Sequence, residues 1–291
     1  MKIAIASGKG GTGKTFVSVN AYHALSMHGR KVVLTDCDAE APDSALFFDV
    51  VPQQESIVTE QVPVIDTDAC TFCGKCHDYC NYGAIFYLPE AGMIRVLDDL
   101  CHSCGACSVA CGFEAITERP VEVGRVTSYG HGPELMLVEA RMRIGAMTPV
   151  PVIKAAIAEA TQQGDLLIMD APPGTSCPFV HTVSRADYVV LVTEPTPFGL
   201  SDLVQSVETL REIGKPMGVV VNRAGLGNRE VYEYLHDERI PLLMEIPFDR
   251  EIASLTSKGK IVAEYMPELA RELAQMILKI EQEYGNSSHQ R

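Results

Sequence analysis

Short runs of apolar residues alternate with longer amphipathic segments along most of this chain. Continuous apolar runs predict buried strands at residues 2–7, 31–35, 135–140, 166–169, 188–193 and 217–221. Apolar residues at helical spacing predict helices that end near Met27, that cover residues 152–161, and that begin near Pro267. Strands that alternate with helices in this way indicate an α/β fold with a mostly parallel, doubly wound sheet.

The expected C-terminal helix has one apolar stripe and an acidic polar face. The stripe consists of Leu269, Leu273, Met276, Ile277 and Ile280. A helix that lies on a membrane surface favours a basic polar face, whereas glutamates outnumber basic residues here. We therefore expect this helix to pack on the protein core, and the residues from Gly285 onward to form a frayed tail.

The alternation of strands and helices is interrupted between residues 61 and 120. We predict three segments: residues 1–60 and 121–291 as two parts of one α/β domain, and residues 61–120 as an inserted α+β domain. Residues 53–61 are expected to form an entry linker. Residues 117–133, which contain several Gly, Thr and Val residues, are expected to form the return linker.

Eight of the ten cysteines lie in the insert, in two copies of the spacing C-x2-C-x2-C-x3-C. The first copy is Cys70, Cys73, Cys76 and Cys80, and the second is Cys101, Cys104, Cys107 and Cys111. Each copy has a glycine between its second and third cysteine, where a tight turn can direct amide groups toward sulfur. This spacing favours iron–sulfur ligation. Zinc sites would pair C-x2-C motifs across a longer loop, and disulfides would require an oxidising compartment.

The insert resembles the bacterial two-cluster ferredoxin family over roughly residues 62–120. The resemblance implies two 4Fe–4S clusters with crossed ligand sets. Cluster 1 would be held by Cys70, Cys73, Cys76 and Cys111, and cluster 2 by Cys101, Cys104, Cys107 and Cys80. The family usually has proline after the fourth cysteine, where this chain has Asn81 and Gly112.

A glycine-rich loop follows the first predicted strand. Residues 8–15 read GKGGTGKT and fit the phosphate-binding pattern G-x4-G-K-[ST]. The backbone amides of this loop can surround phosphates at the start of a helix. Lys14 is expected to contact the β- and γ-phosphates, and the Thr15 hydroxyl to bind Mg²⁺. The nucleotide-binding residues predicted here are Gly8, Lys9, Gly10, Gly11, Thr12, Gly13, Lys14 and Thr15.

The early lysine of this loop, Lys9, resembles the deviant Walker A motif of the MinD/ParA/Mrp family. That resemblance implies an ATPase in which two subunits enclose two ATP molecules. Lys9 would then reach the partner's nucleotide and stabilise charge that develops on the phosphates. The predicted partners are a second copy of the chain or a paralogous subunit.

Four further segments resemble the same family, and together with the loop they cover about residues 1–50 and 135–280. Asp38 lies in a switch I-like segment and would position the attacking water or the metal shell. Asp170 begins a Walker B and switch II-like segment, so it would hold Mg²⁺, and the Gly174 amide would sense the γ-phosphate. The predicted adenine contacts are Asn222, Arg223, Pro247 and Asp249.

Two cysteines remain outside the insert. Cys37 follows the second predicted strand, and Cys177 comes seven residues after Asp170. The nitrogenase iron protein has a ligand of a bridging cluster at the position that matches Cys177, but it needs a second cysteine within the region that matches residues 121–150. That region contains no cysteine here. Both thiols are therefore expected to be buried and structural. The alternative is a transient transfer of metal or sulfide at the dimer interface.

The net charge of −14 excludes nonspecific binding to nucleic acid as a main function. No apolar run approaches the length of a membrane-spanning helix, and the chain begins with a strand pattern in place of a targeting segment. Reduced cluster ligands then predict a cytoplasmic protein.

The favoured hypothesis is an ATP-dependent iron–sulfur protein. Its nucleotide cycle would gate electron transfer, or docking to a redox or metal-cofactor partner protein. Two alternatives stay open: an ATPase that assembles or inserts iron–sulfur or other metal cofactors, and a spatial regulator of the MinD/ParA kind with redox-sensing clusters.

Overall fold

The body of the protein is a nine-stranded sheet, seen in a computed structural model that describes residues 1–131 and 134–285. The strand order is β11-β10-β9-β1-β8-β2-β7-β6-β3. The seven strands from β11 to β7 run parallel, whereas β6 and β3 are added antiparallel at one edge. The parallel strands are β1 (Lys2–Ala6), β2 (Val32–Asp36), β7 (Glu134–Met142), β8 (Leu166–Asp170), β9 (Tyr188–Thr193), β10 (Met217–Ala224) and β11 (Leu242–Pro247).

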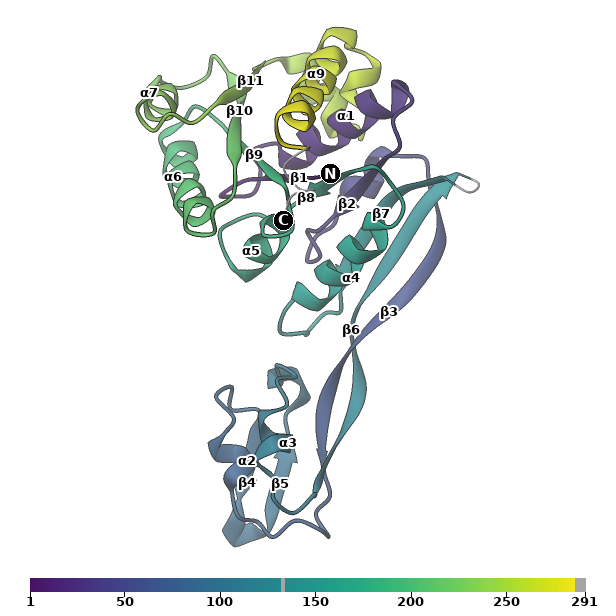
Figure 1. The fold of residues 1–291 in the computed structure, drawn as a ribbon, viewed down its shortest axis with the longest axis vertical. Helices are drawn as coiled ribbons and strands as arrows, with labels where there is room; N and C mark the ends of the chain where they lie inside the picture. The colour runs from purple at the N-terminus through teal and green to yellow at the C-terminus, as the bar shows by residue number, and fades with distance from the viewer. Residues whose placement is uncertain (132–133, 286–291) are drawn as a thin grey trace.

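Helices cover both faces of this sheet, which confirms the predicted α/β architecture (Figure 1). One face packs against α1 (Lys14–Met27) and α9 (Pro267–Tyr284). The other face packs against α4 (Val150–Thr161), α5 (Cys177–Val183), α6 (Pro197–Glu212) and α7 (Glu230–Asp237). Helix α8 (Arg250–Ser257) lies near the C-terminal end of the chain, and four short 3-10 turns cover Ser44–Phe47, Pro89–Ala91, Asp98–Leu100 and Val262–Glu264.

The C-terminal helix packs on the core, as its apolar stripe predicted. All five residues of the stripe in α9 are buried, and the helix lies against α1. Among the described residues, no helix is long and apolar enough to cross a bilayer. The predicted frayed tail beyond Gly285 lies outside the described residues.

The two segments predicted as linkers are strands, so that prediction was wrong. Strand β3 (Val51–Ile65) pairs with β6 (Ile116–His131) along its whole length, from Val51 opposite Gly130 to Ile65 opposite Ile116. Most side chains of β3 are exposed or half-buried. Its sequence also lacks the regular alternation of apolar and polar residues that identifies a half-buried strand. Residues 132–133 of the predicted return segment lie outside the described residues.

The ribbon of β3 and β6 extends from the sheet and carries residues 66–115 at its far end (Figure 1). We call these residues the cysteine unit. It contains α2 (Lys75–Asp78), α3 (Ala106–Ala110) and a hairpin of β4 (Ile85–Leu88) with β5 (Met93–Val96). A small core of Cys76, Ile85, Ile94 and Cys107 lies inside it.

The ribbon leaves the sheet at a β-bulge. Val58 pairs with Gly124 and Thr59 pairs with Glu122, which leaves Val123 as the additional residue on β6. Gly124 is also the last β6 residue in register with β7, where it pairs with Met142. A Cβ atom at Gly124 would lie 2.5 Å from the Arg141 carbonyl oxygen and 2.6 Å from a methyl carbon of Val152 in α4.

Gly124→Ala should therefore destabilise the protein. We expect the free energy of unfolding to fall by about 1–3 kcal/mol, because the added methyl group overpacks the contact between the ribbon and α4. Denaturant titration of the full chain measures this change. Gly112→Ala is the matched control, since a Cβ there meets no atom within 4 Å. Equal stability of the two variants would contradict the prediction.

Candidate nucleotide site and cysteine cavities

The glycine-rich loop connects β1 to α1 at the carboxyl edge of the parallel sheet. Gly11 and Gly13 have φ angles of 82° and 97°, which favour glycine. A Cβ atom at Gly13 would also lie only 2.2 Å from Nδ2 of Asn222. Helix α1 begins at Lys14, and no side chain caps its N-terminus. The first amide groups of the helix can therefore bind an anion.

Lys14 lies beside the carboxylate of Asp170 in the buried part of this site. Its Nζ is 3.1 Å from Oδ1 of Asp170, and the Ser18 hydroxyl donates to the same oxygen over 3.0 Å. Burial by itself lowers the pKa of Lys14, but the nearby carboxylates of Asp170, Asp38 and Asp36 raise it above its ordinary value. Lys14 is therefore a cation at the point where the predicted phosphate groups would lie.

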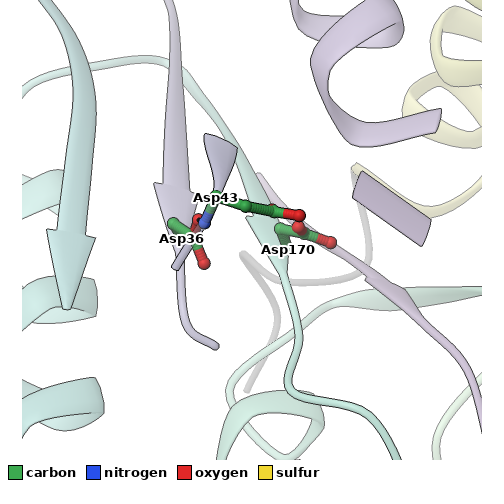
Figure 2. A group of neighbouring side chains, drawn as sticks. All are labelled: Asp36, Asp43 and Asp170. Carbon is green, nitrogen blue, oxygen red and sulfur yellow. The ribbon is translucent and has the colours of Figure 1, made fainter. Parts of the chain in front are cut away.

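Three carboxylates gather where β2 and β8 end (Figure 2). Asp36 and Asp170 are the last residues of these strands, and Asp43 lies in the segment that follows β2. One oxygen each of Asp36, Asp43 and Asp170 lies within 4.8 Å of the others. Within the described residues, Oδ2 of Asp170 and Oδ1 of Asp43 are buried and have no hydrogen-bond partner. Burial raises the pKa of Asp43, and the nearby Thr15 hydroxyl opposes that rise. Unpartnered carboxylate oxygens near a hydroxyl fit a hard cation such as Mg²⁺.

Asp36 was not among the predicted site residues, although it organises the switch I-like segment. It is fully buried, and its carboxylate accepts hydrogen bonds of 3.0, 3.0 and 2.9 Å from the backbone amides of Asp38, Asp43 and Ser44. Burial, followed by the charge of Asp170, raises its pKa to about 7. The sequence contains one usable signal: Asp36 is the last residue of a buried parallel strand, and such strand ends converge at one edge.

We expect Asp36→Ala to release the segment from Asp38 to Ser44. The substitution removes the carboxyl group that accepts three backbone hydrogen bonds, each of which contributes about 0.5–3 kcal/mol. The amides of residues 38, 43 and 44 should then exchange at least about tenfold faster, as measured by hydrogen exchange with mass spectrometry. The exposed residue Asp49, changed to alanine, serves as the control. Unchanged exchange at the three amides would show that Asp36 does not hold this segment.

Asp38, the predicted switch residue, lies at the edge of the same group. Burial raises the pKa of its carboxyl to about 6, while the charge of Lys14 opposes that rise. Gly174, predicted as a γ-phosphate sensor, has a φ angle of 90°. Its amide donates over 3.1 Å to the Ser7 carbonyl, which lies just before the glycine-rich loop. The structure thus brings Asp38 and Gly174 to the same edge as Lys14 and Asp170.

Lys9 is held within its own chain by two acidic residues that no sequence motif indicates. Its Nζ lies 3.1 Å from Glu194 and 3.8 Å from Asp202, and 5.8 Å from the centre of the Phe198 ring. Glu194 also accepts a 2.7 Å hydrogen bond from Arg223. Both acidic residues lie beyond the end of β9 and are far from Lys9 in the sequence, so only the topology brings them together.

The predicted adenine-contact residues come from two neighbouring strands. Asn222 pairs with Ile246, and the next ladder pair joins Ala224 to Pro247, so the two segments lie side by side. Asn222 donates 2.8 Å to the Thr12 carbonyl, and Arg223 donates 3.2 Å to the Gly11 carbonyl. Asp249 instead caps α8 by accepting from the Glu251 amide. In this structure Asn222 and Arg223 therefore brace the glycine-rich loop.

Two cavities in the cysteine unit each contain four cysteines. The first is lined by Cys70, Cys73, Cys76 and Cys111, and the second by Cys80, Cys101, Cys104 and Cys107. Each encloses about 340 Å³ of space that is partly open to solvent. The fold thus brings together three cysteines of one motif copy with the fourth cysteine of the other copy. These groupings coincide with the two predicted ligand sets.

The two motif copies have matching backbone conformations around these cavities. Phe72 and Ser103 have φ angles of 53° and 50°, and each amide donates over 3.4 Å to the sulfur two residues earlier, on Cys70 and Cys101. The Ala84 amide donates over 3.3 Å to the sulfur of Cys80. Amide groups directed at sulfur stabilise thiolates and cluster ligands, so the donor set fits iron–sulfur ligation.

The cysteines outside the cysteine unit differ in their surroundings. Cys37 is fully buried, and burial raises the pKa of its thiol well above the ordinary value. Cys177 is exposed at the first turn of α5. The expectation of a buried structural thiol agrees with the burial of Cys37 but was wrong for Cys177, which the first turn of α5 leaves exposed.

A glycine-rich loop between β1 and α1, with a buried lysine and acidic strand ends, defines a P-loop nucleotide-binding protein. The chain belongs to the CobQ/CobB/MinD/ParA nucleotide-binding domain family, whose model matches residues 3–262.

Relatives extend this comparison over nearly the whole chain. The uncharacterized protein MJ0578 of Methanocaldococcus jannaschii is 29% identical, over 97% of both chains. The iron–sulfur cluster carrier protein of Aquifex aeolicus is 25% identical, over 96% of this chain and 65% of that protein. The solved structure of the Pyrococcus furiosus cell division ATPase MinD has the same fold, with a TM-score of 0.56, 24% identity, and coverage of 96% and 98%.

Proposed function

We propose that this protein is an ATPase that carries two 4Fe–4S clusters. Its nucleotide cycle would control electron transfer by those clusters or docking to a partner protein. The observation that supports the cluster assignment is the content of the two cavities, each of which contains the four cysteines of one crossed ligand set. Bound there, the clusters would supply one-electron transfer. The cysteine unit would then act as a ferredoxin-like domain inserted into the nucleotide-binding body.

The residues proposed to bind the nucleotide and its Mg²⁺ are Lys14, Thr15 and Asp170. Lys14 would turn from Asp170 toward the β- and γ-phosphates, while Thr15 and Asp170 would hold Mg²⁺. The unpartnered oxygen of Asp170 supports this assignment. Asp38 would position the attacking water, since its raised pKa gives it a stronger affinity for a proton than an exposed aspartate has.

Lys9 would act across an interface between two subunits. In the single chain it is paired with Glu194 and Asp202. Both acidic partners are partly exposed, and ion pairs in such a setting contribute only about 0–1 kcal/mol to stability. Association of two chains with ATP could therefore replace these two ion pairs by contacts with the partner's nucleotide. We propose a dimer of two identical or paralogous chains that closes with ATP and opens after hydrolysis. The output is electron transfer or docking to a redox or metal-cofactor partner protein.

The full chain, reconstituted anaerobically with iron and sulfide, tests this function. We expect ATP, but not ADP, to produce a dimer in analytical ultracentrifugation and to change the rate at which the reduced clusters are reoxidised by a dye. An affinity capture from anaerobic extract with ATP or ADP would identify the partner. Binding of ATP with no change in assembly, reoxidation or captured protein would contradict the gating proposal.

A second candidate function, delivery of clusters to other proteins, is favoured by two of the relatives, from Aquifex aeolicus and Rickettsia bellii. Both relatives are named as iron–sulfur cluster carrier proteins. Loss of cluster absorbance from this chain, with matching gain in an apo-acceptor, would support delivery. The structure favours resident clusters, because both cavities use all the cysteines of the cysteine unit and several sulfurs accept amide hydrogen bonds.

A further inference from the structure

One arginine contacts the ribbon and the cysteine unit from the end of a strand of the nucleotide-binding body. Arg143 is the first residue after β7, and β7 pairs in parallel with β2, the strand that ends at Asp36. Its guanidinium Nη2 lies 3.5 Å from the carboxylate of Asp99 in the cysteine unit. Its Nε donates over 2.8 Å to the carbonyl of Glu122 in the ribbon.

The backbone of Arg143 contacts the bulge through which the ribbon leaves the sheet. Its amide donates over 2.9 Å to the carbonyl of Val123, the additional residue of that bulge. Bulges bend a strand and interrupt its pairing, so a ribbon can change direction there. Arg143 therefore holds both the base of the ribbon and the unit at its far end.

The residue before Arg143 is bonded to the switch I-like segment. The Met142 amide donates over 2.9 Å to the carbonyl of Ala39, which follows Asp38 directly. Ala39 is buried, and the amide of Cys37, two residues earlier, donates over 2.9 Å to the Asp170 carbonyl. Backbone hydrogen bonds and short stretches of chain thus connect Asp170 and the switch segment to Met142. Arg143 continues the connection through hydrogen bonds to Glu122 and Val123 and an ion pair with Asp99.

We propose that Arg143 is a positioning residue that couples the switch I-like segment to the orientation of the cysteine unit. This inference rests on the proposed function, because it assumes that nucleotide moves the switch segment. A shift of Ala39 would move Met142 and therefore the guanidinium that holds Asp99. The contact with Asp99 is weak enough to be reversible: Arg143 is 39% exposed and Asp99 76% exposed, a setting in which ion pairs contribute about 0–1 kcal/mol.

Hydrogen exchange of the reconstituted full chain, with and without Mg²⁺ and a non-hydrolysable ATP analogue, tests the coupling. In the wild-type protein we expect the analogue to change exchange at residues 10–18, at residues 38–44, and at residues 97–101 and 122–124. In Arg143→Gln the first two responses should persist, while the response at 97–101 is lost. Asp99→Asn, an exposed change that cannot disturb the core, should reduce the response at 97–101 by up to about fivefold.

Arg141→Gln is the matched control. Arg141 lies two residues away and pairs with Glu139 inside the nucleotide-binding body. Its variant should respond to the analogue as the wild-type protein does. A response at 97–101 that survives in both Arg143→Gln and Asp99→Asn would overturn the inference, as would a wild-type response limited to residues 10–44. If the analogue changes nothing even at residues 10–18, nucleotide binding itself fails, and the proposed function falls together with the inference.

Discussion

Replacing Cys111 with alanine should remove about half of the iron from the reconstituted protein, from about eight to about four atoms per chain. Cys111 lies in the second motif copy but lines the cavity of the first. Its loss should therefore leave Cys70, Cys73 and Cys76 open to alkylation, while Cys80, Cys101, Cys104 and Cys107 stay protected. Mass spectrometry of the alkylated protein, together with iron analysis, measures both effects.

Two further variants make this result specific. Cys80→Ala should give the complementary pattern, in which Cys101, Cys104 and Cys107 become alkylated. Cys177→Ala changes an exposed thiol outside the cysteine unit and should leave the iron content unchanged. If Cys111→Ala instead exposed the other cysteines of its own motif copy, the clusters would be ligated within each copy and the crossed assignment would be wrong.

Lys9→Ala should lower the turnover number for ATP by about 10³-fold, the lower end of the effect of residues that stabilise charge on a transferring phosphoryl group. Nucleotide binding to the single chain should persist, because Lys14 and the amides of the loop remain. Stability should change little, since Lys9 makes only partly exposed ion pairs. Single-turnover hydrolysis, equilibrium nucleotide binding and thermal unfolding measure the three quantities.

The control for Lys9→Ala is Lys279→Ala, which removes an exposed lysine on α9. Mixing experiments separate action within a chain from action across the dimer. If Lys9 acts on the partner's nucleotide, a hydrolysis-deficient Asp38→Asn chain that retains Lys9 should restore turnover when mixed with Lys9→Ala. Full activity of Lys9→Ala alone would show that Lys9 is only a partner of Glu194.

The parallel part of the fold could be predicted because its strands are buried on both faces. Continuous apolar runs such as residues 188–193 have few other structures available to them, and β9 has the predicted bounds. The ribbon could not be predicted in the same way. Strand β3 contains Pro52 and Pro63 and exposes most of its side chains, so neither alternation nor propensity distinguishes it from a linker. Its pairing with β6 depends on backbone groups that sequence patterns do not reveal.

The candidate site likewise contains residues that local motifs predict and residues that only the topology brings together. The glycine loop and the cysteine spacing are local, and the sequence placed their residues correctly relative to one another. Asp36, Asp43 and Glu194 depend on non-local topology. Nothing near Asp36 distinguishes it from Asp38 until the ends of β2 and β8 are seen to meet at Asp170. Glu194 becomes part of the site because β9 lies beside β1, so the segment after β9 reaches the loop that carries Lys9.

The pairing of Ile65 with Ile116 has an evolutionary consequence. The chain enters and leaves the cysteine unit at adjacent positions on two bonded strands, so the unit is attached to the body through a single narrow stalk. A segment with neighbouring ends can be gained, lost or exchanged without rethreading the host fold. We expect homologues that share the sheet to carry different modules, or a plain hairpin turn, on this stalk.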